Sequence, residues 1–333
     1  MLSRRTAIAA TGIAALGMAG GRVAKALQSN SAIPIIDTHV HLFDPNRPQG
    51  TPVVIPGSVT AKTGSLPGPY KALTEPLGVV GAIHIEASNW VEDNLWALEV
   101  CAGNDIMVGV VGNLNPEVPE FPEYLERYHR NPMFRGIRYG NIWGYDLIGQ
   151  SHNRTVLDRL KLLAQADLVM DSASPDIELL QALIRVNDAI PDLRIVIDHL
   201  PGFEPAADAR PAYESLLREF HQRPSVFVKL SQILHKINGK VSTRLLDHKE
   251  SLDHLVETFG EDRVIFGSDY PNSDTSTSVD NVFRVAKEYF ADKSVEAAEK
   301  YFWRNSQRVY KWMPRTRRQR NMDSNGAARR TVE

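Results

Sequence analysis

The chain has 333 residues, which is enough for one large domain or two ordinary ones. Hydrophobic residues make up 43% and charged residues 23%, as in a typical globular protein, and the formal net charge is −2. This balance disfavours a nucleic-acid-binding protein, which usually has a clear basic excess. Cys101 is the single cysteine, which excludes an internal disulfide and a metal cluster held by thiolates alone.

Residues 1–26 have the layout of an export signal. Arg4 and Arg5 precede an uncharged run over 6–21, and residues 24–26 match an A-x-A cleavage pattern. The paired arginines are similar to those of a bacterial twin-arginine signal, so we expect a mature chain in the periplasm or outside the cell. The alternative is an N-terminal helix or a membrane anchor, but the run is shorter than the roughly 20 apolar residues that span a bilayer. We expect no stable membrane span after processing.

Eight runs of β-branched and apolar residues follow, each bounded by turn residues. Several are continuously apolar, which is typical of parallel strands that are buried on both faces. The predicted strands are Ile33–Asp37, Val79–Ala87, Ile106–Asn113, Phe134–Gly140, Leu168–Asp171, Leu193–His199, Val226–Ser231 and Val264–Asp269. Helical patterns lie between them over 91–102, 155–165, 177–190, 211–222 and 251–259.

This alternation predicts a (β/α)8 TIM barrel that forms a single domain over residues 27–313. The alternative is a doubly wound open sheet, although the chain after the signal has no glycine-rich phosphate-binding pattern. Residues 42–77 are rich in proline and glycine, and we expect a long irregular loop over the barrel mouth. Residues 314–333 include six arginines without apolar periodicity, and we expect a disordered basic tail there.

In such a barrel the chemistry lies at the carboxyl ends of the strands. His39 and His41 follow the first run, and residues i and i+2 of an extended chain point to the same face, so both imidazoles can reach one divalent ion such as zinc. Asp269 ends the last run and can ligate the same ion or take a proton from an attacking water. The alternatives are two solvated histidines and an aspartate that caps a helix.

Other polar residues end neighbouring runs. We expect His199 to polarise a carbonyl oxygen or to protonate a leaving group, and Asp198 beside it to point out of the site and brace a ring N–H. Arg138 suits a substrate carboxylate, with an internal salt bridge as the alternative. Glu86 is a candidate metal ligand, proton carrier or partner for a sugar hydroxyl, or else a structural salt-bridge partner. Weaker candidates at the mouth are Tyr139, which we include among the substrate-binding residues, Ser231 and Asn113.

Four of these motifs, in this order, resemble the amidohydrolase-related family, also called amidohydrolase 2, of the amidohydrolase superfamily. The similarity covers most of residues 33–312 and is greatest to the group of L-fuconolactonase and 2-pyrone-4,6-dicarboxylate lactonase. The motifs are Asp37-Thr-His39-Val-His41, Gly136-Ile-Arg138, Ile197-Asp198-His199-Leu and Phe266-Gly-Ser-Asp269-Tyr-Pro.

The resemblance implies a hydrolase in which Asp269 activates the water that attacks a lactone or a related ester-like bond of a sugar-acid or dicarboxylate-type small molecule. It implies either one divalent ion, with zinc first, at His39, His41 and Asp269, or catalysis without a metal. Decarboxylases of the family carry a histidine in the fifth strand, where this chain reads LVMDSAS. A metal-dependent decarboxylase and a non-catalytic periplasmic binding barrel are the alternatives, and both a monomer and a homo-oligomer remain open.

Overall fold

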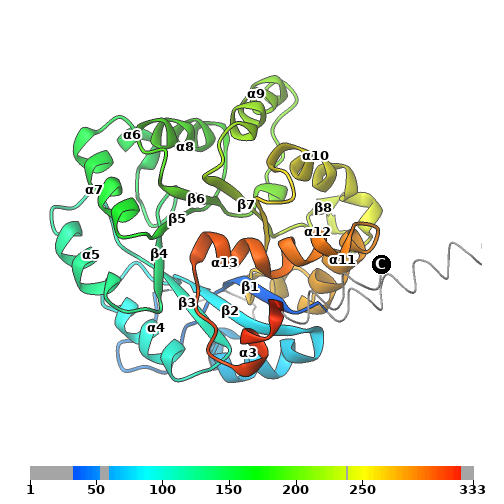
Figure 1. Ribbon diagram of the computed structural model, residues 1–333, viewed down its shortest axis with the longest axis horizontal. Coiled ribbons are helices and arrows are strands. Elements are labelled where there is room, and N and C mark those ends of the chain that lie inside the picture. Colours follow the sequence, from blue (N-terminus) through cyan, green and yellow to red (C-terminus); the bar gives the residue numbers. More distant parts are fainter. Residues whose placement is uncertain (1–32, 53–59, 238, 324–333) are drawn as a thin grey trace, which may run out of the picture.

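The centre of the molecule is a sheet of eight parallel strands whose spatial order follows the chain, β1-β2-β3-β4-β5-β6-β7-β10. The computed structural model describes residues 33–52, 60–237 and 239–323, so the predicted signal at 1–26 lies outside the described residues. Helices surround the sheet (Figure 1), and the predicted single (β/α)8 barrel is confirmed. The strands are β1 (Ile35–Val40), β2 (Val79–Ile85), β3 (Met107–Gly112), β4 (Phe134–Arg138), β5 (Val169–Ser172), β6 (Arg194–Ile197), β7 (Val226–Leu230) and β10 (Val264–Phe266).

The longer helices cover the outside of the barrel. Five of them lie within two residues of the predicted helices, whereas the others were not predicted. They are α3 (Pro67–Thr74), α4 (Asp93–Ala102), α5 (Phe121–His129), α7 (Arg154–Gln165), α8 (Ile177–Ala189), α9 (Arg210–His221), α10 (Lys249–Phe259) and α11 (Val279–Ala291). Among the described residues, no helix is long and apolar enough to cross a membrane.

Shorter elements connect these strands and helices. The short helices are α2 (Thr60–Thr63), α6 (Leu147–Gln150), α12 (Val295–Glu299), α13 (Asn305–Tyr310) and α14 (Arg317–Arg320), with a π-helix η5 (Lys300–Arg304) before α13. The 3-10 helices are η1 (Glu75–Leu77), η2 (Leu200–Gly202), η3 (Leu245–Asp247) and η4 (Asn272–Thr275). A two-stranded hairpin, β8 (Lys236–Ile237) and β9 (Lys240–Val241), follows β7.

The first and last strands meet and close the barrel. The hydroxyl of Thr38 donates to the carbonyl of Phe266 at 2.6 Å, and the amide of Ser268 donates to Oδ1 of Asp37 at 2.8 Å. A parallel bridge joins Val40 to Tyr270 just beyond the end of β10. This closing seam places the end of β1 directly beside the residues that follow β10.

The segment expected to be a long irregular loop, residues 42–77, is partly helical. α3 begins at Pro67, where the fixed φ of proline favours the first helical turn and its missing N–H costs nothing. Tyr70 of α3 is buried and donates its hydroxyl to Oδ2 of Asp37 at 2.7 Å. The prediction was therefore wrong for α2, α3 and η1, while residues 53–59 lie outside the described part of the chain.

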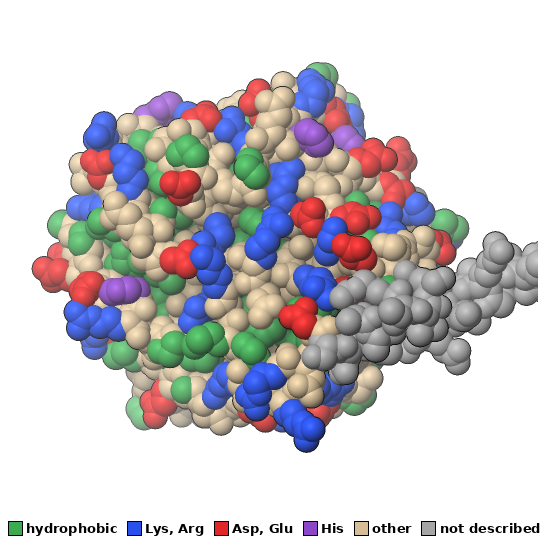
Figure 2. Space-filling model, in the orientation of Figure 1, with side chains coloured by type: hydrophobic (Ala, Val, Ile, Leu, Met, Phe, Trp, Pro, Cys, Tyr) green, Lys and Arg blue, Asp and Glu red, His purple; other side chains and the backbone are tan. Residues whose placement is uncertain are grey.

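The expected disordered tail is wrong for residues 314–323, which pack across the amino end of the barrel. Gln319 of α14 is buried and donates to the carbonyls of Val80 and Asp105, at 2.8 and 3.1 Å. Arg315 donates to carbonyls at the end of α4. In Figure 1 α13 crosses this end of the barrel, and Figure 2 shows acidic and basic side chains interspersed over the same face. The remainder of the predicted tail, residues 324–333, lies outside the described residues.

Candidate active site

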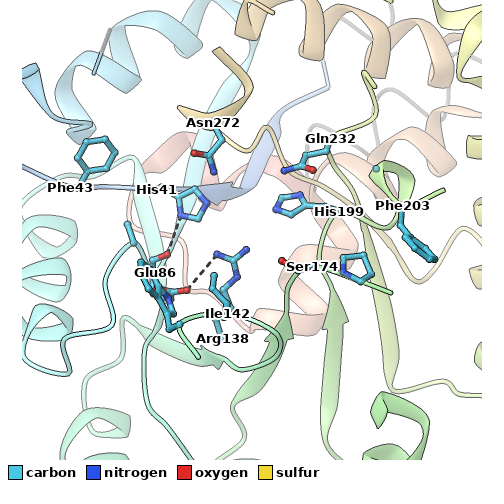
Figure 3. A pocket seen from close by; sticks show the side chains of 14 residues that line it. His41, Phe43, Glu86, Arg138, Ile142, Ser174, His199, Phe203, Gln232 and Asn272 are labelled. Carbon is cyan, nitrogen blue, oxygen red and sulfur yellow. Dashed lines mark hydrogen bonds and ion pairs between the residues drawn. The ribbon is translucent and has the colours of Figure 1, made fainter. Parts of the chain in front are cut away.

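A cavity opens where the carboxyl ends of the strands meet, which is where the sequence analysis places the chemistry. Its volume is about 430 Å³, which is within the range of small-molecule sites. Figure 3 shows side chains from several strand ends pointing into it. The lining residues are His41, Phe43, Glu86, Ala87, Arg138, Ile142, Trp143, Ser174, Pro175, His199, Gly202, Phe203, Gln232 and Asn272.

Three imidazole rings surround one carboxylate oxygen beneath this cavity. Oδ1 of Asp269 lies 3.7 Å from Nε2 of His39, 3.3 Å from Nε2 of His41 and 3.8 Å from Nε2 of His199. Burial disfavours the charged carboxylate, but the three rings favour it more strongly, and the pKa of Asp269 lies well below its usual range. The structure thus brings together the four residues that the sequence analysis placed at the catalytic and metal positions, with an ionised carboxylate at their centre.

Unusual backbone angles aim two of these side chains at the cavity. His199 and Asp269 have φ values of 59° and 60°, and Gln232 after β7 has 51°. The left-handed region costs a residue other than glycine of order 1–3 kcal/mol and is retained mainly where function requires it. At His199 it also breaks the alternation of an extended chain. Asp198 follows the alternation of β6 and reaches inward to His39 instead of pointing out of the site, which corrects the prediction for Asp198, and the turn at His199 lets the next side chain face the cavity as well.

The hydroxyl of Ser231 orients the ring of His199. Nδ1 of His199 lies 2.7 Å from Oγ of Ser231, and both side chains are buried. Burial lowers the pKa of His199 to about 4, so the ring is neutral near pH 7. When the hydroxyl donates to Nδ1, the single ring proton lies on Nε2, the atom that faces Asp269. His199 is then a hydrogen-bond donor at the cavity floor.

Two amide side chains that the sequence analysis missed hold the carboxylate of Asp269. Nε2 of Gln232 donates to Oδ2 at 2.7 Å, and Nδ2 of Asn272 donates to Oδ1 at 3.0 Å. Both residues also line the cavity. They lie in polar turns after β7 and β10, where the sequence carries no signal that separates them from ordinary loop residues. Their contacts fix the plane of the carboxylate that the histidines surround.

Arg138 lines the cavity as predicted, but its charge is already paired. Its Nε lies 3.2 Å from Oδ2 of Asp198, and its Nη1 lies 3.5 Å from Oε1 of Glu86. Oε2 of Glu86 accepts hydrogen bonds from Nε1 of Trp143 at 2.8 Å and from the amide of Ser88 at 3.2 Å. The internal salt bridge considered as an alternative for both residues is therefore present, although both also face the cavity.

Tyr139, predicted to bind substrate, does not face the cavity. Its side chain is buried outside the barrel and donates its hydroxyl to Oε1 of Glu117 at 3.0 Å. Arg138 points inward, so the next residue of the extended chain points to the opposite face. Asn113 is likewise absent from the cavity wall, and its Nδ2 donates to the carbonyl of Ser88 at 2.8 Å.

A buried ammonium that the sequence analysis missed lies below the histidines. Nζ of Lys229 on β7 is 2.6 Å from Oδ2 of Asp171, 3.0 Å from Oδ1 of Asp198 and 3.2 Å from Nδ1 of His39. The hydroxyl of Tyr310 donates to the Asp171 carboxylate. The signal was a single lysine inside the apolar run VFVKL, because a charged residue in a strand buried on both faces needs internal partners.

Comparison with known proteins identifies the family. A sequence model of amidohydrolases matches residues 36–312. The chain belongs to the amidohydrolase family. This amidohydrolase is 28% identical over 205 residues to L-fucono-1,5-lactonase of Burkholderia ambifaria, covering 60% of this chain and 69% of that protein. It is 25% identical over 284 residues to L-fucono-1,5-lactonase of Burkholderia multivorans, covering 80% of this chain and 91% of that one.

A solved structure shares the fold. An amidohydrolase from Burkholderia multivorans, determined with bound zinc, superposes with a TM-score of 0.73 at 20% sequence identity, covering 84% of this chain and all of that one. The family assignment and the lactonase relatives make this protein an enzyme of the hydrolase class.

The donor set of this amidohydrolase fits one divalent ion. Single ligand atoms of His39, His41 and Asp269 lie within 4.8 Å of one another. Nδ1 of His41 lies 3.1 Å from the carbonyls of Ile85 and Glu86, so in the neutral ring Nδ1 carries the proton and Nε2, which lies 3.3 Å from Oδ1 of Asp269, has the lone pair that a metal ion needs. Burial, Lys229 and His199 lower the pKa of His39 well below its usual value, and its Nε2 has no hydrogen-bond partner among the described residues.

Proposed function

We propose that this amidohydrolase hydrolyses a lactone and that Asp269 is the general base for the attacking water. The observation that carries the proposal is the ionised Asp269 carboxylate, surrounded by three imidazole rings directly beneath a small-molecule cavity that His41 and His199 line. The two lactonases among the curated relatives support the same reaction class.

In the proposed reaction Asp269 accepts a proton from water as the water oxygen attacks the lactone carbonyl carbon. Nε2–H of His199 donates to the carbonyl oxygen, on which negative charge develops. The ring C–O bond then breaks, and the proton held by Asp269 passes to the departing alkoxide. The product is the open-chain hydroxy acid, and the carboxylate is regenerated. Gln232 and Asn272 keep the carboxylate oriented throughout.

His39, His41 and Asp269 would hold the divalent ion. Such an ion supplies a Lewis acid for the carbonyl oxygen and lowers the pKa of a bound water. Imidazole nitrogens and a carboxylate oxygen are ligands that suit zinc. The carbonyls of Ile85 and Glu86 fix the ring of His41 for this role.

The charges of the cavity favour a neutral sugar lactone over a dicarboxylate. Arg138 is the single lysine or arginine among its lining residues, and Asp198 and Glu86 already compensate its charge. A substrate with two carboxylates would enter beside Glu86 and the ionised Asp269 without a free cation to receive it. Sugar hydroxyls, in contrast, can donate to Glu86 and accept from Arg138, while Phe43 and Trp143 offer apolar surface to the sugar ring.

The test is a lactone hydrolysis assay that follows acid release, with zinc-loaded and metal-free protein. We expect turnover of neutral sugar lactones and much weaker turnover of dicarboxylate lactones. Asp269→Asn should lower kcat by roughly 10²–10⁴-fold, the usual contribution of a general base. Asp158→Asn, at an exposed position of α7, is the matched control and should keep full activity. An active, folded Asp269→Asn variant would refute the assignment of the base.

We also propose that the enzyme is exported by the twin-arginine route. The arginine pair at residues 4–5 and the A-x-A pattern at residues 24–26 support this proposal. Fractionation of cells that express the full chain should place the enzyme in the periplasm with a new N-terminus near Leu27. Replacement of both arginines by lysine should retain it in the cytoplasm. Periplasmic protein that still begins at Met1 would contradict cleavage.

A further inference from the structure

Two sets of possible metal ligands meet at one ring. The first is His39, His41 and Asp269, and the second is His39 with Asp198 and His199, whose ligand atoms also lie within 4.8 Å of one another. All five side chains are buried. On ligand chemistry alone, the residues could therefore hold an ion on either side of His39. Two ions at once would require the His39 ring to release its remaining N–H proton to solvent and to bridge them as an imidazolate, because a neutral imidazole has one lone pair.

The second set differs because its carboxylate already has cations as partners. Oδ1 of Asp198 lies 3.0 Å from Nζ of Lys229, and Oδ2 lies 3.2 Å from Nε of Arg138. Asp269, by contrast, has no lysine or arginine within ion-pair distance among the described residues, and its other contacts are neutral amides. A metal ion at Asp198 would have to displace a fully buried ammonium or share the carboxylate with it.

Lys229 is held firmly in this place. Its Nζ is anchored on the opposite side by Asp171, at 2.6 Å, and lies 5.4 Å from the ring centre of Tyr310. The exposed fraction of the Lys229 side chain is 0%. Burial raises the pKa of Asp171 to about 7, and Arg138 contacts the carboxylate of Asp198 from the cavity side.

We propose that the Lys229 ammonium takes the place of a second metal ion. It forms an ion pair with the Asp198 carboxylate and so limits the site to one divalent ion. Lys229 is thus a positioning residue, which acts through Asp198 and His39 without touching the substrate. The inference rests on the proposed metal site and adds the reason why the second ligand set stays without an ion. Removing the positive charge of Lys229 should allow the second ligand set to bind an ion.

The experiment measures zinc stoichiometry by calorimetric titration of metal-free protein and by elemental analysis. The wild type should bind one ion, whereas Lys229→Gln should bind two. Lys229→Gln leaves the buried Asp171 without its cation, so we pair it with Lys229→Gln/Asp171→Asn, which removes one positive and one negative charge together. Lys287→Gln, at a half-buried lysine of α11 that donates to the carbonyl of Leu77, is the control and should bind one ion.

Substitutions of the carboxylates identify the ligands without relying on the fold of a Lys229 variant. In the wild-type background, Asp198→Asn should still bind one ion at saturating zinc, with affinity lowered by at most roughly 10–100-fold, as for other residues that contact a metal ligand. Asp269→Asn should bind none at the same zinc concentration. Adding Asp198→Asn to the double variant should remove its second ion.

Two outcomes would overturn the inference. One is a double variant that binds a single ion, and the other is loss of the wild-type ion in Asp198→Asn. Wild-type protein that binds no zinc would instead refute the metal part of the proposed function. In that case an ion gained by the double variant through Asp198 still supports the role of Lys229, and no gain refutes it.

Discussion

The guanidinium of Arg315 is expected to stabilise the barrel from its amino end, and Arg315→Ala tests this directly. Its Nη1 and Nη2 donate to four backbone carbonyls between the end of α4 and the start of β3, at 2.5–2.8 Å. The acceptors are Cys101, Ala102, Asn104 and Met107. The last carbonyls of a helix have no partner within the helix, and a cation near them also interacts favourably with the helix dipole.

The size of the effect follows from these contacts. Hydrogen bonds to a charged group contribute about 1.5–3 kcal/mol each, and carbonyls near the surface regain water when the side chain is removed. Counting two bonds at the lower value gives about 3 kcal/mol for Arg315→Ala. For a chain of this size, whose unfolding entropy is about 2.1 cal/mol/K per residue, that free energy corresponds to a fall in Tm of roughly 4–5 °C.

The assay is thermal unfolding followed by circular dichroism, with urea unfolding as a second measurement. Arg317→Ala is the matched control, because Arg317 lies two residues away, is exposed and carries the same charge. It should change Tm by only a small fraction of the Arg315→Ala effect, since exposed substitutions are usually within about 0.5 kcal/mol. Equal Tm values for the two variants would show that the four carbonyl contacts contribute no net stability and would refute the reasoning.

Two further predictions concern the cavity. Ser231→Ala removes the hydroxyl that holds Nδ1 of His199, so kcat for lactone hydrolysis should fall about 10-fold, equivalent to about 1.4 kcal/mol, while KM and Tm change little; an unchanged kcat contradicts the orienting role. Trp143→Phe keeps an aromatic wall but deletes the N–H that Glu86 accepts, so KM should rise several-fold with kcat nearly constant. Steady-state kinetics separates the two parameters, and a loss confined to kcat in Trp143→Phe would contradict a substrate-binding role.

The sequence predicted the site residues best at strand ends where the alternation of side chains along an extended chain decides which of them point into the barrel. Alternation along an extended chain placed His39 and His41 on the same face, and their position after a buried run placed them at the mouth. Tyr139 was placed in the site only because it ends the fourth run, whereas the same rule turns it away from the inward direction of its neighbour Arg138. The rule fails at His199, which faces the cavity next to the inward Asp198, because the left-handed backbone of His199 is not encoded in a periodic pattern.

Contacts between residues that are far apart in the sequence could not be predicted from such local patterns. Lys229 is conspicuous in the apolar run of β7, but its three partners come from β1, β5 and the residue after β6. Gln232 and Asn272 reach the Asp269 carboxylate only because two turns meet there. The composition of residues 314–323 is that of a solvated tail, whereas single side chains such as Arg315 satisfy carbonyls more than 200 positions earlier.

The seam between β1 and β10 means that assembly of the site and completion of the fold are the same event. His39 lies in the first strand, His41 directly follows it, and Asp269 follows the last strand, so no amino-terminal fragment that ends before residue 269 contains both halves. Contacts of such sequence separation form slowly, because a long chain segment must be ordered before they add stability. A nascent chain that ends before residue 269 therefore lacks the proposed base and part of the proposed ligand set. Turnover or zinc uptake during refolding would report barrel closure itself, with no added probe.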